Sequence, residues 1–154
     1  MKKLIKLVFI FVFVFVLTSC GIEFPPLEDD AIGFRISYLE DENDDNMGYG
    51  TIEYNGRTYA TFGLYNNSLK EGDIDKCIGY IVQDENASSV VDLDNKDTRV
   101  YTLKSDPENN FLMEYYIKSN LMNEPIFYRA IDTKGEDIKI PSFIKDIGES
   151  YWNK

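Results

Sequence analysis

The chain has 154 residues, enough for one domain with a buried core, and its 27 acidic against 16 basic side chains give a net charge of −11. Such a charge repels nucleic acid, so nucleic-acid binding is not predicted. Histidine is absent, which excludes the catalytic triads and most of the zinc sites that depend on an imidazole.

The first twenty residues have the pattern of an export signal. Three lysines within the first six residues precede an unbroken apolar run at 7–17. This run is about half the ~20 apolar residues that a spanning helix needs, so a permanent transmembrane anchor is not predicted. The small residues Thr18 and Ser19 follow it, directly before Cys20.

This segment resembles a bacterial lipoprotein precursor, whose pattern asks for an aliphatic residue, two small residues and an invariant cysteine. The resemblance implies that residues 1–19 are a signal peptide, and that Cys20 carries a lipid that holds the protein on the extracytoplasmic face of the cell membrane. Residues 20–30 are then a tether, and 31–154 form a single β domain. The mature chain keeps 13 basic and 27 acidic side chains, a net charge of −14. The alternative is an ordinary secretory peptide with an incidental cysteine.

After the tether, the sequence predicts β-strands. Apolar and polar residues alternate in short runs, and no stretch of ten or more residues shows an apolar period of 3.6. The first strand is predicted at 32–39, and the acidic loop 40–46 follows it.

The acidic loop holds the chain's most concentrated set of oxygen ligands. Asp41, Asn43 and Asp45 match the first three ligand positions of an EF-hand calcium loop. Asn46 and Ile52 then stand where that loop needs glycine and glutamate. A solvated acidic loop is therefore the preferred interpretation. No cofactor is predicted, and calcium is the alternative left open.

The clearest local signal is Asn55-Gly56, which stands between two alternating runs at 49–62. A type I′ turn requires positive φ at both central positions, which these two residues tolerate, so a β-hairpin is predicted. In that register two cross-strand pairs form, Tyr54 with Arg57 and Ile52 with Tyr59.

Further strands are predicted at 77–83, 98–104, 111–118, 126–131 and 137–140, and residues 142–152 are compatible with one short helix. Strands at this spacing, separated by turn residues, favour an antiparallel arrangement. The predicted fold is all-β and mainly antiparallel, a small barrel or sandwich of about seven to eight strands with at most a short C-terminal helix.

Segments 49–63, 76–84 and 111–132 are similar to small uncharacterised lipoproteins of low-GC Gram-positive bacteria. The resemblance covers most of 48–141. It implies a single domain and implies no activity.

Two motifs contain residue types that could act in catalysis. Cys77 lies in an apolar, strand-like run, so a buried and inert thiol is predicted. Ser142 and Lys145 match the S-x-x-K pattern of serine β-lactamases and penicillin-binding enzymes, but the companion motifs are absent. No catalytic residue is predicted, and the protein is not expected to be an enzyme.

Eleven tyrosines are the remaining feature, and Tyr115 and Tyr116 are adjacent, so on a strand they point to opposite faces. Tyrosine is enriched at interfaces, which makes this pair a candidate interaction surface. The leading hypothesis is a non-enzymatic, lipid-anchored surface module that binds a basic protein or peptide, with an immunity-type role included. The alternatives are an enzyme or accessory acting on envelope polymers and a calcium-dependent structural module.

Overall fold

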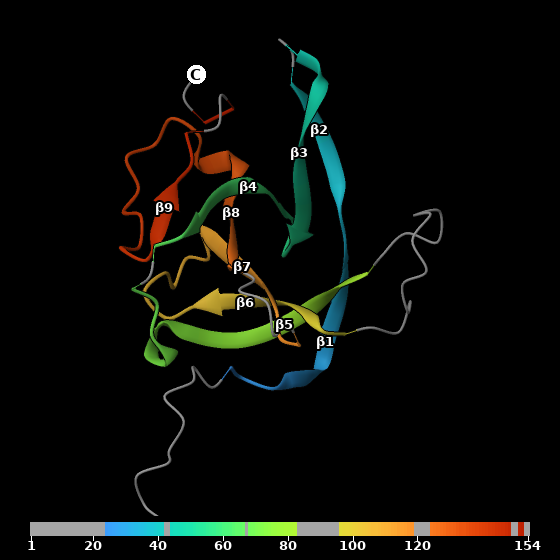
Figure 1. The fold of residues 1–154 in the computed structure, drawn as a ribbon, viewed down its shortest axis with the longest axis vertical. Helices are drawn as coiled ribbons and strands as arrows, with labels where there is room; N and C mark the ends of the chain where they lie inside the picture. The colour runs from blue at the N-terminus through green and yellow to red at the C-terminus, as the bar shows by residue number, and fades with distance from the viewer. Residues whose placement is uncertain are drawn as a thin grey trace, which may run out of the picture.

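The computed structural model describes residues 24–41, 44–66, 68–82, 96–118, 124–148 and 151–152, with the side chains of 41 and 44–47 excepted. Strands dominate these residues, which confirms the all-β class (Figure 1). The strands are β1 Leu27–Arg35, β2 Ser37–Asp41, β3 Asp44–Tyr54, β4 Arg57–Tyr65, β5 Ile74–Val82, β6 Thr98–Leu103, β7 Phe111–Tyr116, β8 Ile126–Ala130 and β9 Ile144–Asp146. Two single 3-10 turns, η1 Glu71–Asp73 and η2 Ile131–Thr133, complete the described elements.

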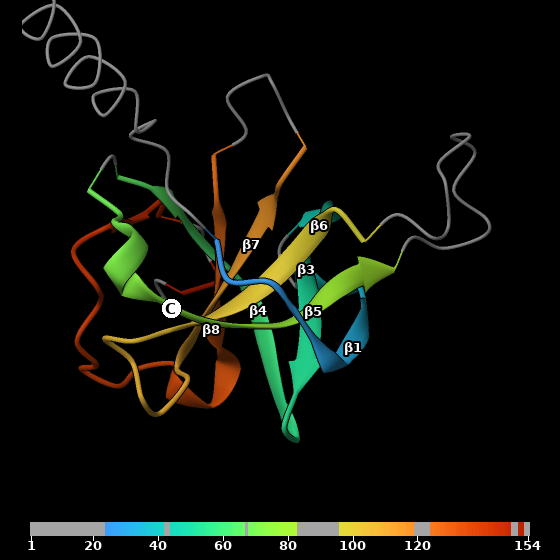
Figure 2. The same cartoon turned by 90° about the horizontal axis from the view of Figure 1, so that it is seen from below.

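One mixed sheet contains all nine of these strands. Its order is β1-β5-β6-β7-β8-β4-β3-β2, with β9 paired to β4. The β1–β5 pair is parallel and the other pairs are antiparallel, as the mainly antiparallel prediction requires. The first and last strands of this order, β1 and β2, are consecutive in the chain and separated by Ile36 alone. The sheet therefore curls back on itself into a half-barrel (Figures 1 and 2).

The predicted hairpin is confirmed as β3 and β4. Asn55 and Gly56 have φ values of 51° and 74°, the positive values that a type I′ turn needs. The register pairs Tyr54 with Arg57 and Ile52 with Tyr59. The local chemistry of the turn thus sets the register of both strands.

Buried side chains form two clusters on opposite faces of the sheet. Alternation along β6, β7 and β8 assigns Val100, Leu112 and Tyr128 to one cluster and their neighbours Tyr101, Met113 and Phe127 to the other. The first cluster also joins Phe34 of β1 to Ile52 of β3, from near the two ends of the strand order. It therefore fills the concave face and is called here the inner core, and the second is the outer core.

The N-terminal segment is packed against the domain from Phe24 onward. The Phe24 ring stacks on Tyr115 with centroids 4.3 Å apart and lies 5.5 Å from the ring of Tyr101. β1 begins at Leu27, which pairs with Cys77, so it starts inside the segment predicted to be a tether. The acidic composition of that segment does not indicate a strand. Its pairing with β5 is a long-range contact, which a local sequence pattern does not encode.

In the C-terminal region the predicted strand at 137–140 is wrong, and the short helix with which 142–152 were compatible does not form among the described residues. Residues 137–140 form no strand, and Pro141, which follows them, lacks a backbone donor for a ladder. In place of a helix at 142–152, Ile144–Asp146 form β9, an edge strand on β4. Three apolar residues of this region, Phe143, Ile144 and Trp152, are buried in the outer core, which favours an extended path.

Trp152 and Arg129 attach the end of the chain to the outer core. The Trp152 indole N–H donates to the Thr61 carbonyl oxygen at 2.7 Å. The Arg129 guanidinium lies over the rings of Trp152 and Phe62, at 5.1 and 5.5 Å from their centroids. Its N–H groups donate to the hydroxyl and carbonyl oxygens of Thr133 at 2.9 and 2.6 Å. A largely buried cation is thus held by aromatic faces and by oxygen atoms of the turn after β8.

The parallel β1–β5 contact requires a residue without a side chain at Gly79. A Cβ atom there would overlap the Ile32 carbonyl oxygen and come within 2.5 Å of the Phe34 ring. Phe34 is 2% exposed and belongs to the inner core, so neither neighbour can retreat without disturbing the closure of the sheet.

We expect Gly79→Ala to lower the free energy of unfolding by about 1–3 kcal/mol, the usual cost of inserting a methyl group into a packed interior. Chemical denaturation measures this change. Gly72→Ala is the matched control, because a Cβ at Gly72 meets nothing within 4 Å. Equal stabilities of the two variants would contradict the close approach.

Candidate functional site

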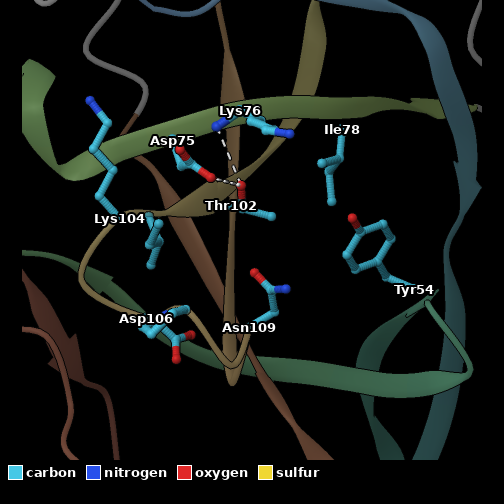
Figure 3. Close-up of a pocket in the computed structure, with 10 residues that line it drawn as sticks. Tyr54, Asp75, Lys76, Ile78, Thr102, Lys104, Asp106 and Asn109 are labelled. Atoms are coloured by element: carbon cyan, nitrogen blue, oxygen red, sulfur yellow. Dashed lines mark hydrogen bonds between the residues drawn. The ribbon is translucent and has the colours of Figure 1, made fainter.

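A hollow of about 380 Å³ lies between the start of β5, the end of β6 and the tip of the β3–β4 hairpin (Figure 3). Its lining combines apolar and charged side chains: Tyr54, Asp75, Lys76, Ile78, Thr102, Leu103, Lys104, Asp106, Pro107 and Asn109. Figure 3 shows Tyr54, Ile78 and Asn109 pointing into the hollow, while the Lys104 side chain points away from it. The hollow therefore presents an aromatic ring, an aliphatic side chain and an amide, with charged side chains around them.

The two carboxylates of the hollow are both occupied by contacts within the protein. The Thr102 hydroxyl donates to Asp75 at 3.4 Å and accepts the Lys76 backbone N–H at 3.3 Å. Asp106 is 7% exposed and accepts the Phe111 backbone N–H at 2.6 Å. Burial raises the pKa of Asp106, and this hydrogen bond partly opposes the rise. These contacts hold both carboxylates in place at the hollow.

Arg57 holds the hairpin tip against the β6–β7 loop and η2. Its Nε and Nη2 atoms donate to the two carboxylate oxygens of Asp132, at 2.9 and 2.8 Å. Nη1 donates to the carbonyl oxygens of Glu108 and Asn109, at 3.0 and 3.1 Å. The hydrogen bonds between Arg57 and Asp132 raise the pKa of the guanidinium and lower the pKa of the carboxyl group. The fork geometry of a guanidinium is what allows one side chain to tie three segments together.

Tyr59 supports the same contact from the inner core. Its hydroxyl donates to the Asn109 carbonyl oxygen at 2.8 Å, and burial raises its pKa to about 12. Asn109 has a φ of 52°, so the loop adopts a left-handed residue at the point where both side chains reach it. The sequence predicted Arg57 and Tyr59 as hairpin residues, and nothing in it indicated their partners 50 or more residues away.

A second polar group lies on the concave face, at Glu114 of β7. The Tyr128 hydroxyl donates to the Glu114 carboxylate at 2.5 Å. Burial raises the pKa of Glu114, and the hydrogen bond from Tyr128 is the contact that opposes this rise. Tyr128 is 2% exposed and belongs to the inner core, which places the carboxyl beside apolar side chains. Sequence reasoning missed Glu114, because a single glutamate in an apolar strand carries no motif.

The predicted lipidation and calcium residues fall mostly outside the described residues. Cys20 and Asn43 are not described, and neither are the side chains of Asp41 and Asp45, although the backbone of Asp41 pairs with Asp44 between β2 and β3. Across the described ranges no group of three or more histidine, cysteine, aspartate or glutamate side chains is placed to hold a metal ion. The same ranges contain no helix long and apolar enough to cross a membrane.

Tyr115 and Tyr116 are both half-buried. Tyr115 is partly covered by the Phe24 ring stacked on it, so this ring contacts the N-terminal segment of the chain itself. Cys77 is fully buried, its thiol donates to the Gly79 carbonyl oxygen at 3.7 Å, and burial raises its pKa, which confirms the buried thiol. Ser142 is exposed in the turn before β9, and Lys145 is exposed on that strand.

No protein-family model matches this chain, and neither the curated proteins nor the solved structures contain a significant match. The geometry of the concave face and the hollow is therefore the basis for inferring a function.

We expect Arg57→Lys to loosen the β6–β7 loop, because an ammonium cannot reproduce the bidentate contact with Asp132 and the two carbonyl contacts together. The loss of free energy of unfolding should be about 1 kcal/mol, since Arg57 is only partly buried. Hydrogen exchange should accelerate at 106–110. Arg35→Lys, at an exposed position on β1, is the control and should leave exchange in that loop unchanged.

The buried carboxyl of Glu114 leads us to expect that the stability of the protein depends on pH. Its pKa is raised above the ordinary value of 4.5, so the folded protein binds more protons than the unfolded chain in the interval between the two values. Stability should therefore fall as pH rises through that interval. Glu114→Gln removes the buried charge while keeping an acceptor for Tyr128. Thermal unfolding between about pH 4 and about pH 8 should show a stability gain that grows with pH.

The matched control is Glu53→Gln, at an exposed position on β3. Its unfolding profile should run parallel to that of the unaltered protein. A Glu114→Gln profile that is also parallel would show that the carboxyl carries no burial cost.

Proposed function

We propose that the protein is a lipid-anchored, extracytoplasmic binding module, without catalytic activity, that binds a basic protein or peptide at the cell surface. The observation that carries the proposal is the hollow beside the hairpin tip. It combines the half-exposed ring of Tyr54 and the half-buried side chain of Ile78 with charged and polar groups, which is the kind of site that accepts a partner's side chain.

The charge of the domain supports a basic partner. A mature chain with a net charge of −14 attracts cationic proteins from a distance and repels nucleic acid. Around the hollow, the exposed acids Asp75 and Glu108 are balanced by two exposed lysines, Lys76 and Lys104. The attraction therefore comes from the charge of the domain as a whole. The exposed run Glu28-Asp29-Asp30 on β1 adds to the field. Long-range attraction of this kind raises the rate of encounter and weakens with salt.

The state of the carboxylates favours binding over hydrolysis of an envelope polymer. A glycoside hydrolase needs two carboxyl groups facing each other across the substrate. In the hollow, Asp75 accepts from Thr102 and Asp106 accepts from the backbone of Phe111, so both are held by structural hydrogen bonds.

Anchoring through Cys20 would keep the domain close to the membrane. Four residue steps separate Cys20 from Phe24, which is packed on Tyr115 and Tyr101. A fully extended chain spans at most about 14 Å over that number of residues. The attachment would thus be short, and a partner approaching the membrane would meet the domain near its surface.

An affinity capture tests the proposed binding. Residues 24–154, immobilised through the N-terminus, should retain a basic protein or peptide from host envelope and culture fluid, and raised salt should release it. Tyr54→Ala should reduce this capture strongly. Tyr80→Ala, at a half-buried tyrosine of β5 that lies against Lys96, should not. Circular dichroism establishes that both variants fold.

Retention of cell-wall glycan without a protein partner would contradict the proposed binding and favour the polymer-acting alternative. Equal capture by the two tyrosine variants would remove the hollow from the binding surface.

The anchor has its own test. Cys20→Ala should abolish metabolic labelling with a fatty acid and move the protein out of the membrane fraction, because the thiol is the proposed site of alkylation. Cys77→Ala is the control and should leave labelling intact, since that thiol is buried. A Cys20→Ala protein that remains labelled in the membrane fraction would refute lipidation at this residue.

A further inference from the structure

Glu114 is a carboxyl group on the concave face for which the described residues provide no cation. Its backbone pairs with Val100 on β6 and Ile126 on β8, so both flanking positions are apolar. Neither of the ion pairs formed among the described residues involves it. Tyr128 supplies its hydrogen bond, at 2.5 Å, and leaves the rest of the carboxyl's acceptor capacity for another donor.

Glu114 is nevertheless within reach of solvent. The residue is half-buried, whereas Val100, Leu112 and Tyr128 around it are almost fully buried. If this carboxyl served only the structure, an amide or an apolar group in its place would cost less free energy to bury, because an unpaired charge is costly to desolvate. The group therefore suits a partner that brings its own positive charge.

Tyr38 adds an aromatic surface on the same face. Ile36 packs against the inner core, and alternation along β2 puts Tyr38 on the same side as Ile36. Its side chain is the most exposed of the large hydrophobic residues in the described structure, at 72%. Burial and the Glu114 carboxyl raise the pKa of the Tyr128 phenol, and the nearby Tyr38 makes a smaller contribution to this rise. The concave face thus carries an exposed ring and an unpaired carboxyl, both near Tyr128, and such groups together hold ammonium and guanidinium ions.

We propose that Glu114 and Tyr38 form a cation-binding subsite that takes a lysine or arginine side chain of the basic partner. This inference rests on the proposed function, and it names the residues that would read the partner's charge. Tyr128 is a positioning residue in this subsite, because its hydroxyl fixes the carboxylate through a short hydrogen bond.

The physical basis is the low polarity of the surroundings. A guanidinium that reaches Glu114 replaces water with a charge-assisted hydrogen bond between apolar neighbours, where such a bond is stronger than on an open surface. Tyr38 would cover the cation from the solvent side and contribute through its ring face. The acid-rich surface of the domain would supply the attraction that brings the partner to this face.

The test uses residues 24–154 and two small probes, N-acetyl-arginine amide and its uncharged counterpart N-acetyl-citrulline amide. The arginine probe should shift the Glu114 carboxyl carbon and the Tyr38 ring signals in a saturable NMR titration, and the citrulline probe should not. Glu114→Gln should weaken binding of the arginine probe about tenfold or more, the usual effect of losing a hydrogen bond to a charged group.

Two further variants separate recognition from folding. Glu53→Gln, the exposed acid on β3, should bind the arginine probe as the unaltered domain does. Tyr38→Ala, at an exposed position that should not affect folding, should weaken binding several-fold. Equal binding of the two probes, or unchanged binding by Glu114→Gln, would overturn the subsite. So would the absence of any shift at Glu114.

The outcome is distinguishable from that of the proposed function. Capture of a basic partner that Glu114→Gln retains in full would leave the binding module standing and remove the subsite. Saturable binding of the arginine probe without any captured protein would do the reverse.

Discussion

The whole architecture depends on one chain segment that forms both ends of the sheet. β1 pairs with β5, and after a single residue, Ile36, the same segment pairs with β3 as β2. The two ends of the strand order are thereby joined covalently, so the sheet has to curl. The inner core exists because this curl brings Phe34 against Ile52, and the parallel contact at Gly79 sets how closely β1 can approach.

Two arginines then fix the segments that the sheet alone does not hold. Arg57 ties the hairpin tip to the β6–β7 loop and to Asp132, and Arg129 holds the turn after β8 under the Trp152 ring. Both use planar guanidinium geometry to reach carbonyl oxygens that an ammonium would satisfy less completely. In a strongly acidic domain these cations serve the structure, and the carboxyl of Glu114 is left without one among the described residues.

The concave face therefore carries carboxyl groups at two places, and these groups differ in how they are hydrogen-bonded. Near the hairpin tip, Asp75 and Asp106 are held by internal hydrogen bonds and leave an aromatic and apolar hollow. Farther along β7, Glu114 is held by Tyr128 alone. A basic peptide laid across the face would meet both a surface for apolar contact and a site for charge.

The features that could be predicted from the sequence are those that depend on local backbone chemistry and on the alternation of apolar residues. Asn55-Gly56 fixed the hairpin because the turn requires positive φ, and the apolar run around Cys77 fixed a buried strand. The tertiary structure decided the rest. Residues 144–146 form a strand because they pair with β4, and the indole of Trp152 is bonded to the Thr61 carbonyl. Arg57 meets Asp132 across 75 residues. Such contacts depend on which strands the curled sheet makes neighbours, and no pattern within a short segment encodes that.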